Sequence, residues 1–173
     1  YKALEDISRE RKLTPEERNE MKAFNKLADS LTPLAKGMNS EFCNQNAYDA
    51  LQIHGGSGFM MDYPIQRIAR DARITSIYEG TTQLQVVAAI RFVMNGSYSA
   101  QLQEWESKEV SDEMRPLQTR SKQLSQLLEE AINHVKEVGD QEFQDLCARH
   151  LVEMAANALM LHLLLYNASQ SPE

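Results

Sequence analysis

One glutamate occupies a position where its carboxylate could act as a base. Glu79 follows Ile77 and Tyr78 and directly precedes Gly80, ahead of an apolar segment. We expect Ile77, Tyr78 and that segment to be buried, which would hold the carboxylate against apolar walls. Such walls disfavour the charged form of a carboxylate and make it a stronger base. A structural role is the alternative, because a carboxylate also stabilises the positive amino end of a helix.

A glycine-rich stretch precedes this glutamate along the chain. It reads Gln-Ile-His-Gly-Gly-Ser-Gly-Phe over residues 52–59. Because glycine lacks a Cβ atom, another chain or a ligand can approach such a backbone closely. Glycines also commonly end helices, so a simple helix cap is an alternative explanation. By itself the stretch is weak evidence for a phosphate-binding site.

Helical patterns predict the elements that hold these two clusters. Thr14, Pro15 and Glu17 form a capped helix start, and apolar residues then recur every three or four positions up to the glycines. Pro33 leaves open whether this segment is one bent helix or two in succession. Further helices are expected near residues 63–71, 81–94, 117–135 and 143–166.

The expected fold class is all-α, because the chain contains no convincing strand pattern. We expect an up-and-down helical bundle over residues 1–97 and an additional helical extension over residues 98–173. The segment after Gly80 is apolar nearly all round, which predicts a buried helix. The apolar faces of the extension need burial, on the bundle or at a subunit contact.

The composition argues against several other classes of protein. A formal net charge of −7 repels a phosphate backbone, so we expect no nucleic-acid binding. Cys43 and Cys147 have no CxxC spacing, so we expect neither a disulfide framework nor a metal site. The longest apolar stretch, residues 159–166, is shorter than the roughly 20 residues that cross a bilayer, and no signal peptide is visible.

Three motifs occur in an order and at spacings that resemble those of the acyl-CoA dehydrogenase family. The first is Gln-x-x-Gly-Gly-x-Gly-Phe at residues 52–59, and the second is Arg-Asp-Ala-Arg-Ile at residues 70–74. The third is Ile-Tyr-Glu-Gly-Thr-x-x-Leu-Gln at residues 77–85. The resemblance is clear over about residues 30–94, and it implies the carboxy-terminal helical domain of that family.

The resemblance also implies roles for individual residues. Glu79 matches the base that removes the α-proton of an acyl-CoA thioester while the β-hydrogen leaves as hydride to the N5 atom of FAD. The backbone N–H of the same residue stabilises the thioester oxygen. Tyr78 and Gly80 match positions that line the substrate pocket. The positions that match FAD contacts are Thr81 and Gln83 and, toward the FAD of a neighbouring subunit, Gln52, Gly55 and Gly56.

Partners and limits follow from the same resemblance. It implies an acyl-CoA substrate, FAD as cofactor, an electron-transfer flavoprotein as acceptor and a homo-oligomer, either dimer or tetramer. We expect a cytoplasmic protein, or a mitochondrial matrix protein in a eukaryote, without membrane insertion. The family's amino-terminal helical and middle β-domains have no counterpart here, so we expect an inactive fragment that binds FAD weakly or not at all. An acyl-CoA oxidase and a non-catalytic oligomerisation module remain as alternatives.

Overall fold

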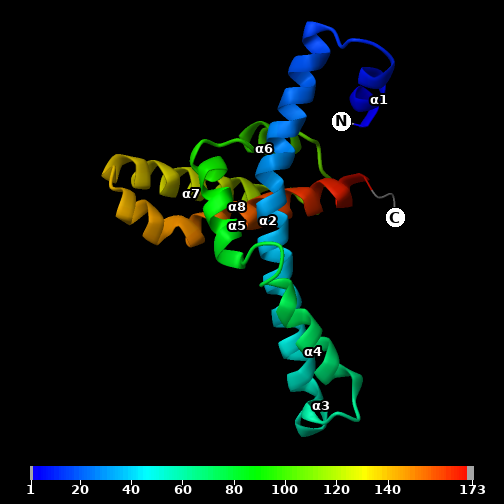
Figure 1. Cartoon of the computed structure of the whole chain (residues 1–173). Helices are drawn as coiled ribbons and strands as arrows, with labels where there is room; N and C mark the ends of the chain where they lie inside the picture. Colours follow the sequence, from blue (N-terminus) through cyan, green and yellow to red (C-terminus); the bar gives the residue numbers. More distant parts are fainter. Residues whose placement is uncertain (1, 171–173) are drawn as a thin grey trace.

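The structure, a computed structural model, describes residues 2–170, and every regular element in that range is a helix (Figure 1). The helices are α1 (Lys2–Glu10), α2 (Pro15–His54), α3 (Gly56–Phe59), α4 (Pro64–Thr75), α5 (Thr82–Met94), α6 (Ser99–Glu106), α7 (Arg115–Val138) and α8 (Gln141–Gln170). The predicted all-α fold is confirmed.

Helix α2 is the longest helix of the described chain, and α3, α4, α5 and α8 all pack against it. It runs without interruption for 40 residues, or about 60 Å. The predicted start is confirmed: the Thr14 hydroxyl accepts from the Glu17 N–H, and the Glu17 carboxylate accepts from the Thr14 N–H. Pro33 lies inside the helix and is buried, so the segment is one helix rather than two.

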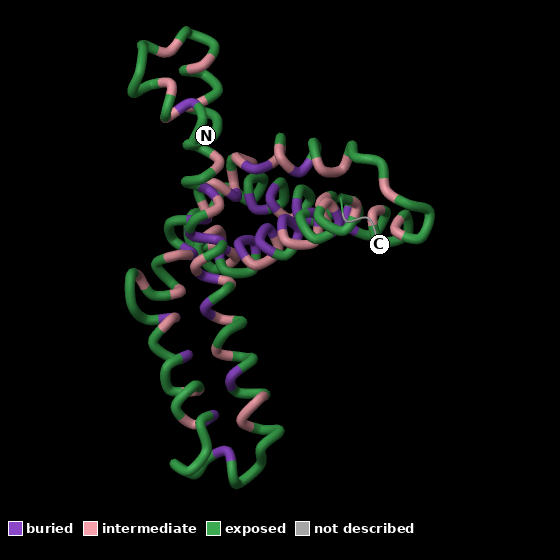
Figure 2. Tube along the Cα trace, turned by 90° about the vertical axis from the view of Figure 1, so that its right-hand side faces the viewer, coloured by how far each residue is buried: buried purple, intermediate pink, exposed green. Residues whose placement is uncertain are grey.

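The glycine-rich stretch reverses the chain at one end of α2. Gly55 ends the helix, α3 makes a single turn, and α4 runs back along α2 (Figure 1). This hairpin of α2, α3 and α4 projects from the rest of the molecule, and most of its residues are exposed (Figure 2). It therefore presents the glycine-rich stretch at a free tip.

The extension after residue 97 shares a core with the helices that precede it. Helices α7 and α8 pair with each other and cross α2, and α8 also packs on α5 and α6 (Figures 1 and 2). The core joins Leu34 of α2 and Val93 of α5 to Leu128 of α7 and Leu159 of α8. Of the two expected alternatives for the extension, the structure shows packing on the first helices.

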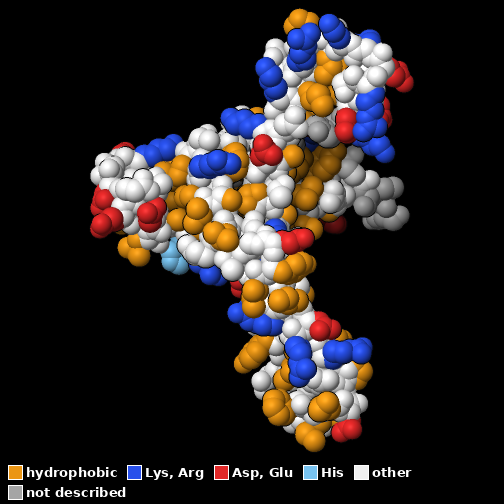
Figure 3. Space-filling model, viewed as in Figure 1, with side chains coloured by type: hydrophobic (Ala, Val, Ile, Leu, Met, Phe, Trp, Pro, Cys, Tyr) orange, Lys and Arg blue, Asp and Glu red, His pale blue; other side chains and the backbone are white. Residues whose placement is uncertain are grey.

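Helix α5 is less buried than its sequence predicts. Its residues Val86, Ala89 and Val93 are buried, but Leu84 and Val87 are 58% and 59% exposed. The prediction of a fully buried helix is wrong, because α2 and α8 cover only one side of α5. Other exposed apolar side chains gather at the free tip of the hairpin, visible at the bottom of Figure 3.

Helix α8 is long and apolar enough to cross a membrane by those two criteria alone. Of its most apolar 18-residue window, 44% is buried inside the fold. Core helices of soluble proteins meet the same criteria, and the buried residues of α8 belong to the shared core. Packing against α5 and α7 thus accounts for much of the apolar character of α8.

Candidate active site

The glutamate predicted as a base lies in a tight turn between α4 and α5, here called the Glu79 turn (residues 76–82). The N–H of Thr82 donates to the Ser76 carbonyl at 3.2 Å and closes the turn. Glu79 has a φ of 53°, and Gly80 has a φ of 93°. The left-handed conformation is unusual for a residue with a side chain, and it is often maintained at functional sites.

Glu79 borders a hollow of about 300 Å³. One wall is the face of α2 that carries Lys36, Asn39 and Cys43, and the opposite side is formed by Tyr78 and Glu79. A larger hollow between α2 and α4 shares Asn39 and Cys43 with it, so the two are neighbours. The predicted catalytic and substrate-binding positions therefore lie together at the edge of a cleft.

Side chains from outside the turn hold its backbone in place. The Lys36 ammonium donates to the Gly80 carbonyl at 2.6 Å, from a position 44 residues earlier in the chain. The Gln85 amide donates to the carbonyls of Glu79 and Gly80 at 3.3 and 3.4 Å. The Thr82 hydroxyl donates to the Glu41 carboxylate at 2.6 Å. The sequence patterns did not single out Lys36 or Glu41, because nothing local links α2 to the turn.

The expectation that this chain buries Glu79 is wrong. The side chain of Glu79 is exposed, and Ile77 and Tyr78 are 45% and 49% exposed. Within residues 76–79, Ser76 alone is buried. The described helices therefore form one side of the site and leave the carboxylate open to water on the other.

The structure requires glycine at two of the three glycine positions in residues 52–59, for different reasons. Gly55 has a φ of 61°, which favours glycine. A Cβ at Gly58 would lie 2.7 Å from the His54 Cβ and 2.9 Å from the Leu51 carbonyl oxygen. At Gly56, φ is not in the left-handed range and a Cβ would meet no atom within 4 Å. Nothing among residues 2–170 requires a glycine at position 56, so its backbone is open to an outside group.

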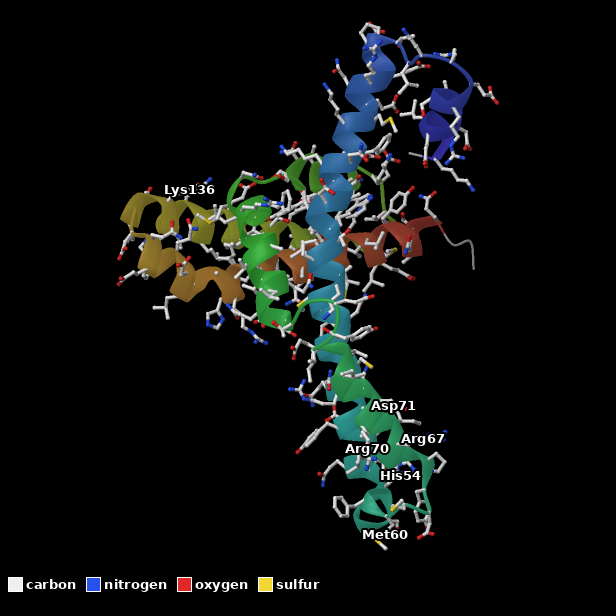
Figure 4. The ribbon with its side chains drawn as sticks, viewed as in Figure 1. His54, Met60, Arg67, Arg70, Asp71 and Lys136 are labelled. Atoms are coloured by element: carbon white, nitrogen blue, oxygen red, sulfur yellow. The ribbon has the colours of Figure 1, made fainter. Side chains whose placement is uncertain are left out.

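The structure does not bring the two sequence clusters together within one chain. Gln52, Gly55 and Gly56 are exposed, and they flank His54, which Figure 4 shows at the free end of the hairpin. About 24 Å of helix separates Gln52 from Lys36, which contacts the Glu79 turn. A single cofactor molecule that bridged both clusters would need to be long or to be shared between chains.

The remaining predicted positions lie at the amino end of α5. Thr81 is the N-cap residue of α5, and its hydroxyl accepts from the Leu84 N–H at 3.4 Å. Thr81 and Gln83 are exposed. The N–H groups at a helix start favour negatively charged ligands, so these positions could meet a phosphate-bearing group as well as cap the helix.

Two family models match this chain. Residues 15–94 match the family model described as acyl-CoA dehydrogenase, C-terminal domain, and residues 94–173 match the model described as acyl-CoA dehydrogenase C terminal. These matches meet inside the shared core and together cover α2 to α8. The chain belongs to the acyl-CoA dehydrogenase family.

Several named relatives match a part of this chain. An acyl-CoA dehydrogenase of Bacillus subtilis (strain 168) is 42% identical over 64 residues, which are 37% of this chain and 17% of that protein. The broad-specificity linear acyl-CoA dehydrogenase FadE5 of Mycobacterium tuberculosis is 48% identical over 60 residues, 35% of this chain and 10% of its own. An acryloyl-CoA reductase (NADH) of Anaerotignum propionicum is 46% identical over 76 residues, which cover 39% of this chain and 19% of that protein. The matched regions span less than a fifth of each relative.

A solved structure shares the fold over almost the whole chain. The protein described as the Bd2924 apo-form superimposes with a TM-score of 0.56 over 95% of this chain and 29% of its own, at 22% sequence identity. At this identity the likeness supports the arrangement of the helices and not the chemistry.

Proposed function

We propose that this chain supplies the carboxy-terminal part of the active site of an FAD-dependent acyl-CoA dehydrogenase, with Glu79 as the base. The observation that carries the proposal is the Glu79 turn. It presents a carboxylate in a left-handed conformation at the rim of a hollow, and side chains from α2 and α5 hold its backbone. Family membership supplies the substrate class, an acyl-CoA thioester.

Two groups of Glu79 would act on the same substrate. Its carboxylate takes the α-proton of the thioester, which leaves negative charge to spread onto the thioester oxygen. A positioned N–H donor stabilises such a charge. The backbone N–H of Glu79 makes no hydrogen bond within residues 2–170, so it is free to donate there. Tyr78 borders the same hollow and Gly80 follows Glu79 in the turn, where they would contact the acyl group.

FAD fits the residues that face outward at two places in the chain. Gly56 has open space beside its Cα and no internal reason to be glycine, and Gln52 and Gly55 are exposed next to it. Thr81 and Gln83 are exposed at the amino end of α5. FAD, when bound, would accept the β-hydrogen as hydride and pass electrons to an electron-transfer flavoprotein.

The distance between these two places supports a homo-oligomer. Because about 24 Å of helix lies between Gln52 and Lys36, the tip of the hairpin would reach the FAD of a neighbouring subunit. The tip also exposes Ile53, Phe59 and Met61, each at least 80% accessible. Apolar side chains gathered at a projecting tip are typical of a subunit contact.

The decisive test replaces Glu79 in a full-length enzyme that carries this chain as its carboxy-terminal region. Glu79→Gln removes the base with little change in size, so FAD binding should persist while an acyl-CoA no longer bleaches the flavin under anaerobic conditions. Glu130→Gln, at an exposed position on α7, is the control and should reduce normally. Normal bleaching in the Glu79→Gln enzyme would refute the assignment and favour a non-catalytic helical module.

The direction of catalysis depends on the redox partner rather than on the base. The same carboxyl group, once protonated, can return a proton to the α-carbon in the reverse direction. The name of the Anaerotignum relative describes a reductase. Assays with saturated and with α,β-unsaturated acyl-CoA should therefore lose activity in parallel in the Glu79→Gln enzyme.

The chain of 173 residues by itself should bind FAD weakly and show no turnover. Glu79 is exposed and the described helices form only one side of the site, so most of the contacts that hold a flavin are missing. A fluorescence titration of this chain with FAD measures the affinity. Tight binding at one FAD per chain would show that these helices suffice.

A further inference from the structure

Within the Glu79 turn, the Thr82 N–H donates to the Ser76 carbonyl and closes the two ends, but no such bond holds the left-handed residues between them. Glu79 and Gly80 both have positive φ values, and the N–H groups of Glu79, Gly80 and Thr81 donate to no described residue. A strained conformation persists only when the surroundings over-determine it. Contacts from outside the turn must therefore fix where the Glu79 carboxylate and N–H point.

Lys36 makes the contact that lies nearest to Glu79 along the chain among the short ones. Its ammonium lies 2.6 Å from the Gly80 carbonyl oxygen and 5.8 Å from the centre of the Tyr78 ring. The side chain is partly buried, and it forms no salt bridge with the described carboxylates. A hydrogen bond from a charged donor is shorter and stronger than one between neutral groups. The single charge of Lys36 is thus directed at the turn.

The other contacts cannot replace Lys36. Gln85 belongs to α5, which follows the turn directly, so it moves with the turn and its hydrogen bonds are longer, at 3.3 and 3.4 Å. Glu41 holds Thr82, three residues beyond Glu79. Among the described residues, only Lys36 forms a hydrogen bond from α2 to the residue that follows Glu79, and α2 forms the opposite wall of the hollow.

We propose that Lys36 is a positioning residue for the base. Its hydrogen bond fixes the Gly80 carbonyl relative to α2, and this fixes the orientation of the Glu79 carboxylate and N–H. This inference rests on the proposed function of Glu79. Lys36 acts through the backbone of Gly80, so its loss should slow proton removal and leave acyl-CoA affinity almost unchanged. A lysine that bound the substrate directly would instead weaken that affinity when removed.

The test uses a full-length, FAD-loaded enzyme that carries this chain. Lys36→Met keeps the apolar stem and removes the donor, and Lys36→Gln is a second loss variant whose amide is one atom shorter. Lys36→Arg keeps a charged donor. Lys26→Met, at an exposed position on the same helix, is the matched control, and Glu79→Gln is the reference for loss of the base.

Three measurements distinguish positioning from other roles. In stopped-flow reduction at saturating acyl-CoA, Lys36→Met and Lys36→Gln should lower the rate constant by about tenfold or more, since small misplacements of reacting groups have large effects. The dissociation constant for acyl-CoA should change by less than about twofold, because uniform binding is unaffected. Lys36→Arg should be faster than either loss variant, and Lys26→Met should equal the unmodified enzyme.

Hydrogen–deuterium exchange gives a readout that does not depend on turnover. Amides of residues 76–82 should exchange at least about tenfold faster in Lys36→Met than in Lys26→Met, because the turn opens more often. Normal reduction and normal exchange in both loss variants would overturn the positioning role, as would a loss confined to acyl-CoA affinity. If Glu79→Gln itself reduces flavin normally, the proposed function fails first, and the exchange result still decides whether Lys36 holds the turn.

Discussion

Replacing Glu79 by glycine should stabilise the fold although it removes the proposed base. With a φ of 53°, Glu79 adopts a left-handed conformation that costs a residue with a Cβ about 1 to 2 kcal/mol. Glycine avoids that cost, but its more flexible unfolded chain offsets about 0.5 to 1 kcal/mol of the gain. From the middle of each range, the net gain is about 0.75 kcal/mol, or about 1.5 to 3 °C in Tm for a chain of this length.

Thermal unfolding of Glu79→Gly beside Glu79→Gln measures this gain. Glutamine removes the same charge and keeps the Cβ, so the difference between the two variants isolates the backbone conformation. Glu79 is exposed and forms no ion pair with the described residues, so little packing is lost in either case. A glycine variant no more stable than the glutamine variant would show that the left-handed turn carries no strain.

Further predictions concern the core, the glycine-rich stretch and a buried phenol. In denaturant titrations, Leu128→Ala should lower the free energy of unfolding by about 3 to 5 kcal/mol, and Leu127→Ala should lower it by less than about 1 kcal/mol. The reason is that the Leu128 side chain is 2% exposed and the Leu127 side chain 52% exposed. Similar losses in the two variants would contradict the core assignment. Gly58→Ala should cost about 1 to 3 kcal/mol, since a Cβ there overlaps its neighbours, whereas Gly56→Ala should leave the Tm of this chain unchanged. Burial raises the pKa of the Tyr98 phenol above its ordinary value. Above about pH 10 the unfolded chain therefore releases the phenolic proton while the folded chain keeps it. The contribution of Tyr98 to the free energy of unfolding is thus complete below about pH 10 and declines above it. The free energy of unfolding of Tyr98→Phe, measured at rising pH, should lack this alkaline decline. An identical decline in the variant would show that other groups cause it.

Local signals in the sequence were sufficient to place most helices. Thr14 and Glu17 begin α2 as predicted, and α5 spans Thr82–Met94, close to the predicted range of 81–94, because capping depends on neighbours within three or four residues. Helix α4 extends to Thr75, beyond the expected end near residue 71. Helix α6 was not predicted, because its few apolar residues, such as Leu102, are anchored only through contact with the later helix α8.

The environment of the site was harder to predict than its residues. The motifs identified Glu79 and its neighbours, and the structure gathers Tyr78, Glu79 and Gly80 at one turn. Burial of Glu79 could not be inferred correctly, because apolar neighbours such as Ile77 are exposed in this chain. Lys36 carries no local signal either: its partner is 44 residues away, and only the path of α4 back along α2 brings the two together.

The shared core has a consequence for how the two family regions can exist apart. Val86, Ala89 and Val93 of α5 are covered by side chains of α8, including Ala155 and Leu159. A chain cut after α5 would leave that apolar surface in water and would tend to aggregate. Residues 15–94 and residues 94–173 therefore share one hydrophobic core. We expect the two regions to unfold together in a single cooperative transition.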